Sequence, residues 1–155
     1  MATIRSQRVR SALLLLALAL FAATPGATAC VPVRLVAEYD ERVDQEATRL
    51  QRAMDEFLTR IEQTPSGEAA RTYLEGVPFY VRYAVDVRAL KARATALQNN
   101  SITVQQLNLM ETSVERLRAL HQSQNTLSPG AIATFRDLFN QAWTAVLTFE
   151  LAKKR

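Results

Sequence analysis

The sequence contains few cysteine, histidine, glycine and proline residues: one Cys, one His, four Gly and five Pro in 155 positions. A single cysteine excludes an internal disulfide framework and any cysteine-based zinc or iron–sulfur site within one chain. The scarcity of glycine and proline excludes collagen-like and low-complexity chains, and it argues against a turn-rich β-sandwich. Hydrophobic residues make up 48% and charged residues 22%, which is typical of a globular protein and too apolar for disorder.

The positive charge is concentrated at the N-terminus. Arg5, Arg8 and Arg10 are the only charged residues among the first 30, so they supply +3 of the net charge of +4 and leave +1 for the rest. A nearly neutral body lacks the broad basic surface of proteins that bind DNA or RNA. We therefore expect no nucleic-acid partner.

The first 29 residues have the pattern of a secretory signal peptide. The three arginines precede an apolar run over residues 12–23, which is shorter than the roughly 20 residues needed to span a bilayer. Small residues ending in Ala27-Thr28-Ala29 then provide an A-x-A cleavage site. The sequence predicts a signal peptide over 1–29 and one domain over 30–155.

Cys30 follows this site directly. The stretch Ala27-Thr28-Ala29-Cys30 resembles the lipobox of bacterial lipoproteins, usually Leu-Ala/Ser-Gly/Ala-Cys, with Ala27 where Leu is preferred. The resemblance implies lipidation of Cys30 and a membrane anchor. Because Val31 rather than Asp follows, the resemblance to enterobacterial lipoproteins implies the periplasmic face of the bacterial outer membrane. The alternatives are ordinary signal-peptidase cleavage, which gives a soluble periplasmic or secreted protein, and an uncleaved anchor.

Two long segments with helical spacing follow. In residues 33–63 the apolar positions recur every three or four residues, which predicts the longest helix of the chain: Val36, Tyr39, Val43, Ala47, Leu50, Met54, Phe57 and Ile61. Residues 64–67 (Thr-Pro-Ser-Gly) end it. The second segment, 68–98, contains Gly76-Val77-Pro78. Because glycine suits a helix end and proline a first turn, we expect this helix to be interrupted at 76–78.

Two further helices have N-terminal signals. Thr103 and Gln106 match a T-x-x-Q capping box, flanked by Ile102 and Leu107 as a hydrophobic staple. The last helix opens at Ser128-Pro129, a cap followed by proline, and its apolar stripe includes Phe139 and Trp143, which we expect to be well buried. No segment alternates as a strand would. The sequence predicts an all-α fold, a four-helix up-down-up-down bundle with its second helix interrupted at 76–78.

The residues needed for common catalytic and metal sites are missing from the sequence. There is no Glu-x-x-His motif, no Gly-x-Ser-x-Gly and no phosphate-binding glycine loop. His121 falls on the apolar stripe of the third helix, so we interpret it as structural. Asp40, Glu41 and Asp44 lie on a charged helix face. We expect no enzyme, no bound metal and no cofactor.

Tyr73, Phe79, Tyr80 and Tyr83 cluster around the expected interruption. A break in a bundle helix can open an aromatic-lined pocket, so these four are candidate ligand-binding residues, with core packing as the alternative. The basic residues Arg82, Arg88, Lys91 and Arg93 either neutralise the acidic first helix or contact anionic lipid headgroups.

Two resemblances bear on function. The stretch 102–106 (Ile-Thr-Val-Gln-Gln) resembles the L-T-x-x-Q motif that small helical periplasmic stress chaperones have twice; here it occurs once. The whole pattern resembles small helical exported bacterial lipoproteins of unassigned role. We therefore predict a cell-envelope lipoprotein that acts by protein interaction or structural support, with an envelope protein as partner. The alternative is a periplasmic binder of small ligands or unfolded proteins.

Overall fold

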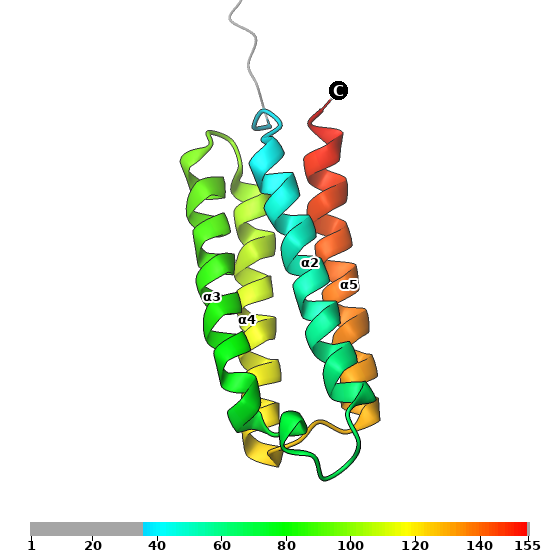
Figure 1. Ribbon diagram of the computed structural model, residues 1–155. Helices are drawn as coiled ribbons and strands as arrows, with labels where there is room; N and C mark the ends of the chain where they lie inside the picture. Colours follow the sequence, from blue (N-terminus) through cyan, green and yellow to red (C-terminus); the bar gives the residue numbers. More distant parts are fainter. Residues whose placement is uncertain (1–35, 155) are drawn as a thin grey trace, which may run out of the picture. The chain divides into compact units, whose positions relative to one another are not determined.

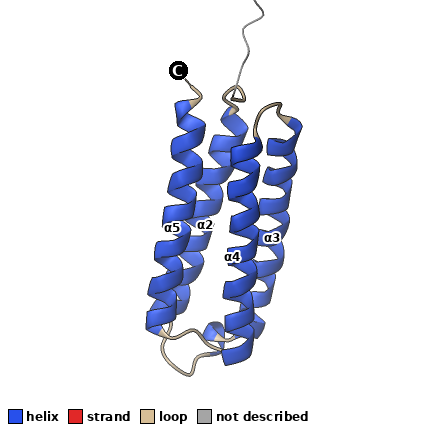
Figure 2. Ribbon diagram, turned by 180° about the vertical axis from the view of Figure 1, so that it is seen from behind, coloured by secondary structure: helices blue, strands red, loops and turns tan. Residues whose placement is uncertain are grey.

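The computed structural model describes residues 36–154, which form four α-helices and one short 3₁₀ helix. The helices are α2 (Glu41–Gln63), α3 (Tyr73–Ala96), α4 (Ser101–Gln124) and α5 (Pro129–Ala152), with η1 (Ala69–Arg71) before α3. Consecutive helices run in opposite directions and lie side by side, and α5 packs against α2 to close the bundle (Figure 1). No strand occurs among residues 36–154 (Figure 2). The predicted all-α four-helix up-down-up-down bundle is confirmed.

Each helix buries one apolar stripe. The stripes have the spacing of three and four predicted from the sequence, and the largest fully buried side chains include Trp143, Tyr80, Phe139, Leu50 and Met54. Phe139 is 2% exposed and Trp143 is fully buried, as expected. Trp143 Nε1 of α5 donates a hydrogen bond of 3.0 Å to Tyr83 Oη of α3, which links two helices that are not consecutive in the chain.

The first helix is shorter than predicted. It begins at Glu41 because Asp40, in an extended conformation, accepts hydrogen bonds from the backbone N–H groups of Arg42 (2.9 Å) and Val43 (3.3 Å). Residues 36–40 precede the helix. With 23 residues, α2 is one residue shorter than each of α3, α4 and α5, so the prediction that it is the longest helix is wrong.

The predicted interruption at 76–78 is also wrong, because α3 is continuous through Pro78. Pro78 lies only five residues after the start of the helix, and its missing N–H removes a single helical hydrogen bond, to the Leu74 carbonyl. Gly76 allows a close approach of its neighbours: a Cβ there would lie 3.3 Å from both His121 Cε1 and the Tyr80 ring, a tight contact. The break before α3 falls earlier, between α2 and Tyr73, where Gly67 has a φ of +93°.

The start of α4 differs from its prediction, whereas the start of α5 agrees. The residue that precedes α4 is Asn100, so Thr103 lies inside the helix and is fully buried, and Ile102 is 47% exposed instead of forming a staple. At α5, Ser128 Oγ accepts a hydrogen bond of 3.2 Å from the Ala131 N–H, with Pro129 in the first helical position.

The buried position of Phe139 gives a direct test of the core. Replacing Phe139 by Ala should lower the free energy of unfolding by ~3–5 kcal/mol, because a large cavity is left in a closely packed core. Urea unfolding followed by circular dichroism measures the loss. Leu109→Ala, at a side chain that is 68% exposed, serves as the control and should change stability by less than about 0.5 kcal/mol. Equal losses in the two variants would contradict this description of the core.

Candidate functional site

The four aromatic residues predicted as a cluster divide into two buried and two half-buried side chains. Tyr80 is 1% and Tyr83 2% exposed. Their hydroxyl groups have partners in the core, since Tyr80 Oη lies 3.0 Å from His121 Nδ1 and Tyr83 accepts from Trp143. Burial raises the pKa of both tyrosines well above the usual value. Both side chains are therefore neutral packing elements near neutral pH.

Phe79 and Tyr73 face different neighbours. The Phe79 ring stacks on Phe57 of α2, with ring centroids 3.8 Å apart and planes inclined by 5°. The Tyr73 hydroxyl accepts a hydrogen bond of 3.1 Å from Arg118 Nε of α4. Only Phe79 and Tyr83 of the four line a common groove, the one between α2 and α3.

This α2–α3 groove has a volume of about 440 Å³, an aromatic floor and charged rims. The charged lining residues are Arg49, Glu56 and Arg60 from α2 and Glu75, Arg82 and Asp86 from α3. Arg49 is bound to Asp86 at 3.0 Å, and the Arg60 guanidinium lies 5.4 Å from the centre of the Phe57 ring. Within residues 36–154, no ion pair joins Glu56, Glu75 or Arg82. The groove thus presents both signs of charge beside an aromatic surface.

Sequence reasoning found Phe79 and Tyr83 but missed the charged lining. The signal was present in the spacing: Glu75, Phe79, Arg82 and Asp86 follow one another at steps of four, three and four, so they share one side of α3. On α2, Arg49, Glu56 and Arg60 have the same kind of spacing.

His121 joins the loops at one end of the bundle. It is fully buried, and its Nε2 lies 2.9 Å from the Arg71 carbonyl oxygen. Because a carbonyl only accepts, Nε2 holds the proton, and Nδ1 of the neutral ring accepts from Tyr80. Burial lowers the pKa of His121, partly opposed by the bond to Arg71. In the described part of the chain, no three His, Cys, Asp or Glu side chains are grouped to hold a metal ion.

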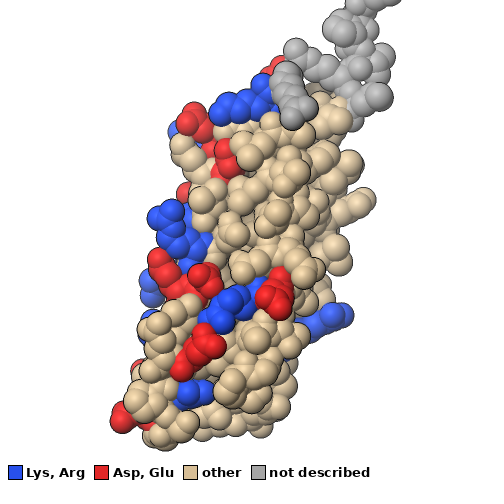
Figure 3. All heavy atoms as spheres, turned by 90° about the vertical axis from the view of Figure 1, so that its right-hand side faces the viewer, with Lys and Arg blue, Asp and Glu red and all other residues tan. Residues whose placement is uncertain are grey.

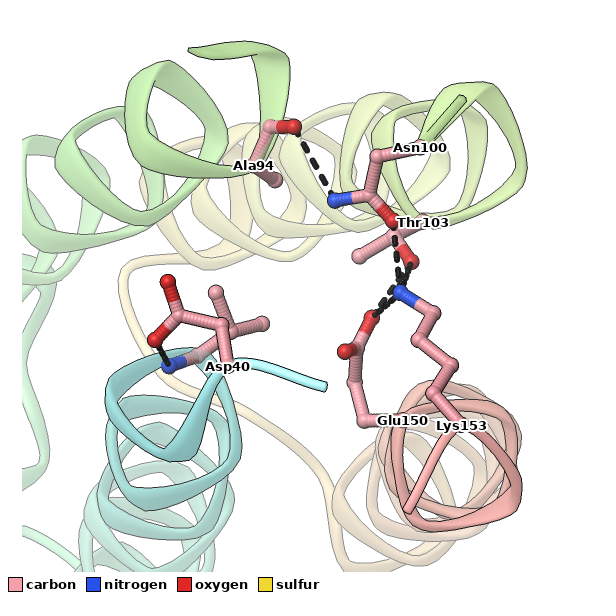
Figure 4. A network of polar contacts seen from close by, with 7 residues as sticks. Asp40, Ala94, Asn100, Thr103, Glu150 and Lys153 are labelled. Carbon is pink, nitrogen blue, oxygen red and sulfur yellow. Dashed lines mark hydrogen bonds and ion pairs between the residues drawn. The ribbon is translucent and has the colours of Figure 1, made fainter. Parts of the chain in front are cut away.

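A second buried network lies where α5 ends beside the start of α4 (Figure 4). Lys153 Nζ donates to Glu150 Oε1 (2.6 Å), Asn100 Oδ1 (2.6 Å) and Thr103 Oγ1 (3.1 Å), and the Thr103 hydroxyl donates to the same Glu150 oxygen at 2.5 Å. The side chains of Glu150 and Lys153 are 0% and 1% exposed. The network fixes the end of α5 to the start of α4. Sequence reasoning missed it, although Glu150 stands four residues after the buried Val146, where the stripe continues.

Surface charges are concentrated on α2 and α3. Figure 3 shows that the side formed by α5 is largely uncharged, and Arg136 of α5 is bound to Asp55 (3.2 Å) and Glu62 (2.7 Å) of α2. The predicted neutralisation between the first two helices occurs for Arg93, which pairs with Asp40 at 2.8 Å. Lys91, by contrast, pairs with Glu111 of α4.

A second apolar stripe runs along the outer face of α3. Leu74 is 75%, Val81 52% and Val85 51% exposed. With Pro78 and Ala92, also exposed, they lie opposite the buried stripe of the same helix, and the charged residue Arg88 interrupts the line. The positions 74, 78, 81, 85, 88 and 92 are separated by steps of four and three, which is the spacing of a helix-pairing seam. We call these six positions the outer stripe of α3.

No protein-family model, curated protein or solved structure that was compared with this chain matches it. Cys30, the predicted lipidation site, and the predicted signal peptide lie outside the described residues. Among the helices that the structure describes, none combines the length and the apolar character needed to cross a bilayer.

The burial of His121 predicts a pH dependence of stability. Its folded pKa lies below the ordinary value of 6.5, so its contribution is complete above that pH and is lost as the pH falls through the folded pKa. Urea unfolding between about pH 7.5 and pH 5.5 should show stability decreasing toward acid. His121→Gln removes the titrating ring and should flatten this dependence. An unchanged dependence in the variant would contradict the assignment.

The buried Glu150–Lys153 pair predicts a strong asymmetry between single and double substitution. Lys153→Met leaves Glu150 buried without its counter-charge and should cost ~3–5 kcal/mol of unfolding free energy. The double variant Glu150→Leu, Lys153→Met should recover most of this loss, because apolar side chains then replace both charges. Arg49→Met, at an exposed pair, is the control and should cost at most about 1 kcal/mol. No recovery in the double variant would be the contrary result.

Proposed function

We propose that this protein is a non-enzymatic cell-envelope lipoprotein, anchored through Cys30, that binds a protein partner with the outer stripe of α3. The observation that supports the binding role is the exposure of Leu74, Val81 and Val85 in one line on a helix whose opposite face is already buried in the core. Scattered exposed apolar residues are ordinary on a monomer, but apolar residues that follow one another along one helix face, as from Leu74 to Val85, are typical of a binding surface.

The spacing of the stripe defines the kind of partner. From Leu74 to Ala92 the stripe extends for about 27 Å along the helix, at roughly 1.5 Å per residue. A partner helix with apolar residues at the same spacing can pack along it, as in helix-in-groove recognition. Arg82 and Glu75, which lie beside the stripe and have no ion pair within the described chain, can then select the charges that flank the partner's apolar face.

Site-specific crosslinking tests the binding role. A photoreactive residue replacing Val81 should yield a protein adduct in native membranes, whereas the same residue replacing Thr144 on the exposed side of α5 should not. The double variant Val81→Glu, Val85→Glu should abolish the adduct formed from a probe at Ala92 and leave unfolding free energy within about 0.5 kcal/mol. Equal adducts from positions 81 and 144 would refute a specific role for the stripe.

Mass spectrometry of the mature protein tests the anchor. We expect a chain that begins at Cys30 and has the added mass of a diacylglyceryl group and an N-acyl chain. A mature chain with an unmodified Cys30 would instead support the soluble periplasmic or secreted form. An intact Met1 would contradict export with cleavage.

The α2–α3 groove supports a second candidate function, the binding of a small ligand. The specific observation is the half-buried Phe79 beside charges of both signs that have no ion-pair partner within residues 36–154. In a ligand screen by thermal shift, a true ligand of the groove should lose its stabilising effect in Phe79→Ala and in Arg82→Gln. It should keep that effect in Phe135→Ala, which alters a half-buried ring on α5 outside the groove.

A further inference from the structure

Three parts of the chain meet at one end of the bundle. Residues 36–40, the turn between α3 and α4 and the end of α5 all lie there (Figure 1). They are in contact, because the Ala37 N–H donates to the Asn99 carbonyl at 3.2 Å and Lys154 Nζ lies 4.9 Å from the centre of the Tyr39 ring. We call this the proximal end, made of residues 36–40, 97–102 and 150–154.

The proximal end exposes apolar side chains from three different elements. Val36 is 42%, Ile102 47% and Leu151 49% exposed, and Lys154, three residues after Leu151, is also exposed. The opposite end, made of residues 64–74 and 125–130, exposes one large hydrophobic side chain, Leu74 at 75%, which belongs to the outer stripe of α3. The two ends of the bundle thus differ: the proximal end exposes apolar side chains from three separate elements, beside Lys154 and Glu38, whereas the opposite end exposes one.

We infer that the proximal end rests on the lipid surface in which Cys30 is anchored. This inference rests on the lipid anchor of the proposed function. Five residues separate Cys30 from Val36, and the six steps from one residue to the next span at most about 20 Å when the chain is fully extended. The helices are about 35 Å long at roughly 1.5 Å per residue. A lipid on Cys30 therefore holds the proximal end, and not the opposite end, beside the bilayer.

The side chains at this end suit the boundary between headgroups and acyl chains. Val36, Ile102 and Leu151 supply apolar surface that leaves water on contact. Lys154 and the Tyr39 ring are of the types that favour the headgroup region, where a cation meets anionic lipid. Glu150 and Lys153 neutralise each other inside the bundle, so neither charge has to enter the lipid surface. In this orientation the helices stand on the membrane, and the outer stripe of α3 faces sideways toward other proteins.

Fluorescence quenching on vesicles tests the orientation. The lipidated mature protein, which begins at Cys30, is reconstituted into vesicles of phosphatidylethanolamine and phosphatidylglycerol that contain a headgroup nitroxide lipid. A bimane label is placed on Gln98→Cys at the proximal end or on Ser66→Cys at the opposite end, both exposed positions. We expect quenching at position 98 to exceed quenching at position 66 severalfold. Equal quenching at the two positions would overturn the inference.

A second pair of variants tests the apolar contact itself. In the Gln98→Cys background, Ile102→Glu with Leu151→Glu should reduce the quenching severalfold while the protein still sediments with the vesicles. Leu109→Glu, which alters an exposed leucine in the middle of α4, is the matched control and should leave quenching unchanged. All three positions are exposed, and circular dichroism confirms that each variant is folded.

The outcomes separate this inference from the proposed function. Cys30 without lipid in the mass spectrum overturns the anchor and the orientation together. Lipid on Cys30 with equal quenching at positions 66 and 98 overturns only the orientation. Lipid on Cys30, no effect of the glutamate pair, and a protein adduct from a photoreactive residue at position 102 would show that a protein, not lipid, covers this end.

Discussion

The register of α3, α4 and α5 depends on two buried polar networks, one at each end of the bundle. Apolar stripes alone permit helices to slide by a turn, because one methyl group packs much like another. Lys153 can satisfy its three acceptors only when the end of α5 is level with the start of α4. His121 reaches the Arg71 carbonyl only when α4 is level with the loop before α3. Each network therefore favours one alignment of its helices. In any other alignment some of these buried polar groups would lack hydrogen-bond partners, which raises the free energy of the folded state.

The fold followed from the sequence because hydrophobic periodicity reports burial directly. Val43 to Ile61 on α2 and Leu107 to Leu117 on α4 repeat every three or four residues, and the buried stripes have that spacing. The errors arose where a local rule competed with packing. Thr103 begins a valid capping pattern, but its hydroxyl is satisfied by Glu150, 47 residues away. Gly76 and Pro78 match a helix end, but the close approach of His121 accounts for the glycine.

The candidate sites were less predictable than the fold. The aromatic residues between Tyr73 and Tyr83 are close together in sequence, which suggested one pocket. On a helix, each residue is rotated by 100° from the last, so Phe79 turns toward α2 while Tyr80 turns toward His121. The outer stripe of α3 was missed for a related reason. α3 has apolar residues on two faces, and the sequence pattern was interpreted for the buried stripe alone. Which helix packs against each face of α3 depends on residues far away in the sequence.

The way the bundle closes has a consequence for the order of folding. α3 packs most extensively on α4, its immediate successor, whereas α2 packs most extensively on α5, the last helix of the bundle. The α3–α4 hairpin needs only a short loop to close and can form as soon as both segments are present. The α2–α5 half must wait until α5 has been synthesised. Until then the buried stripe of α2 is exposed, and its many charged residues keep that waiting segment soluble.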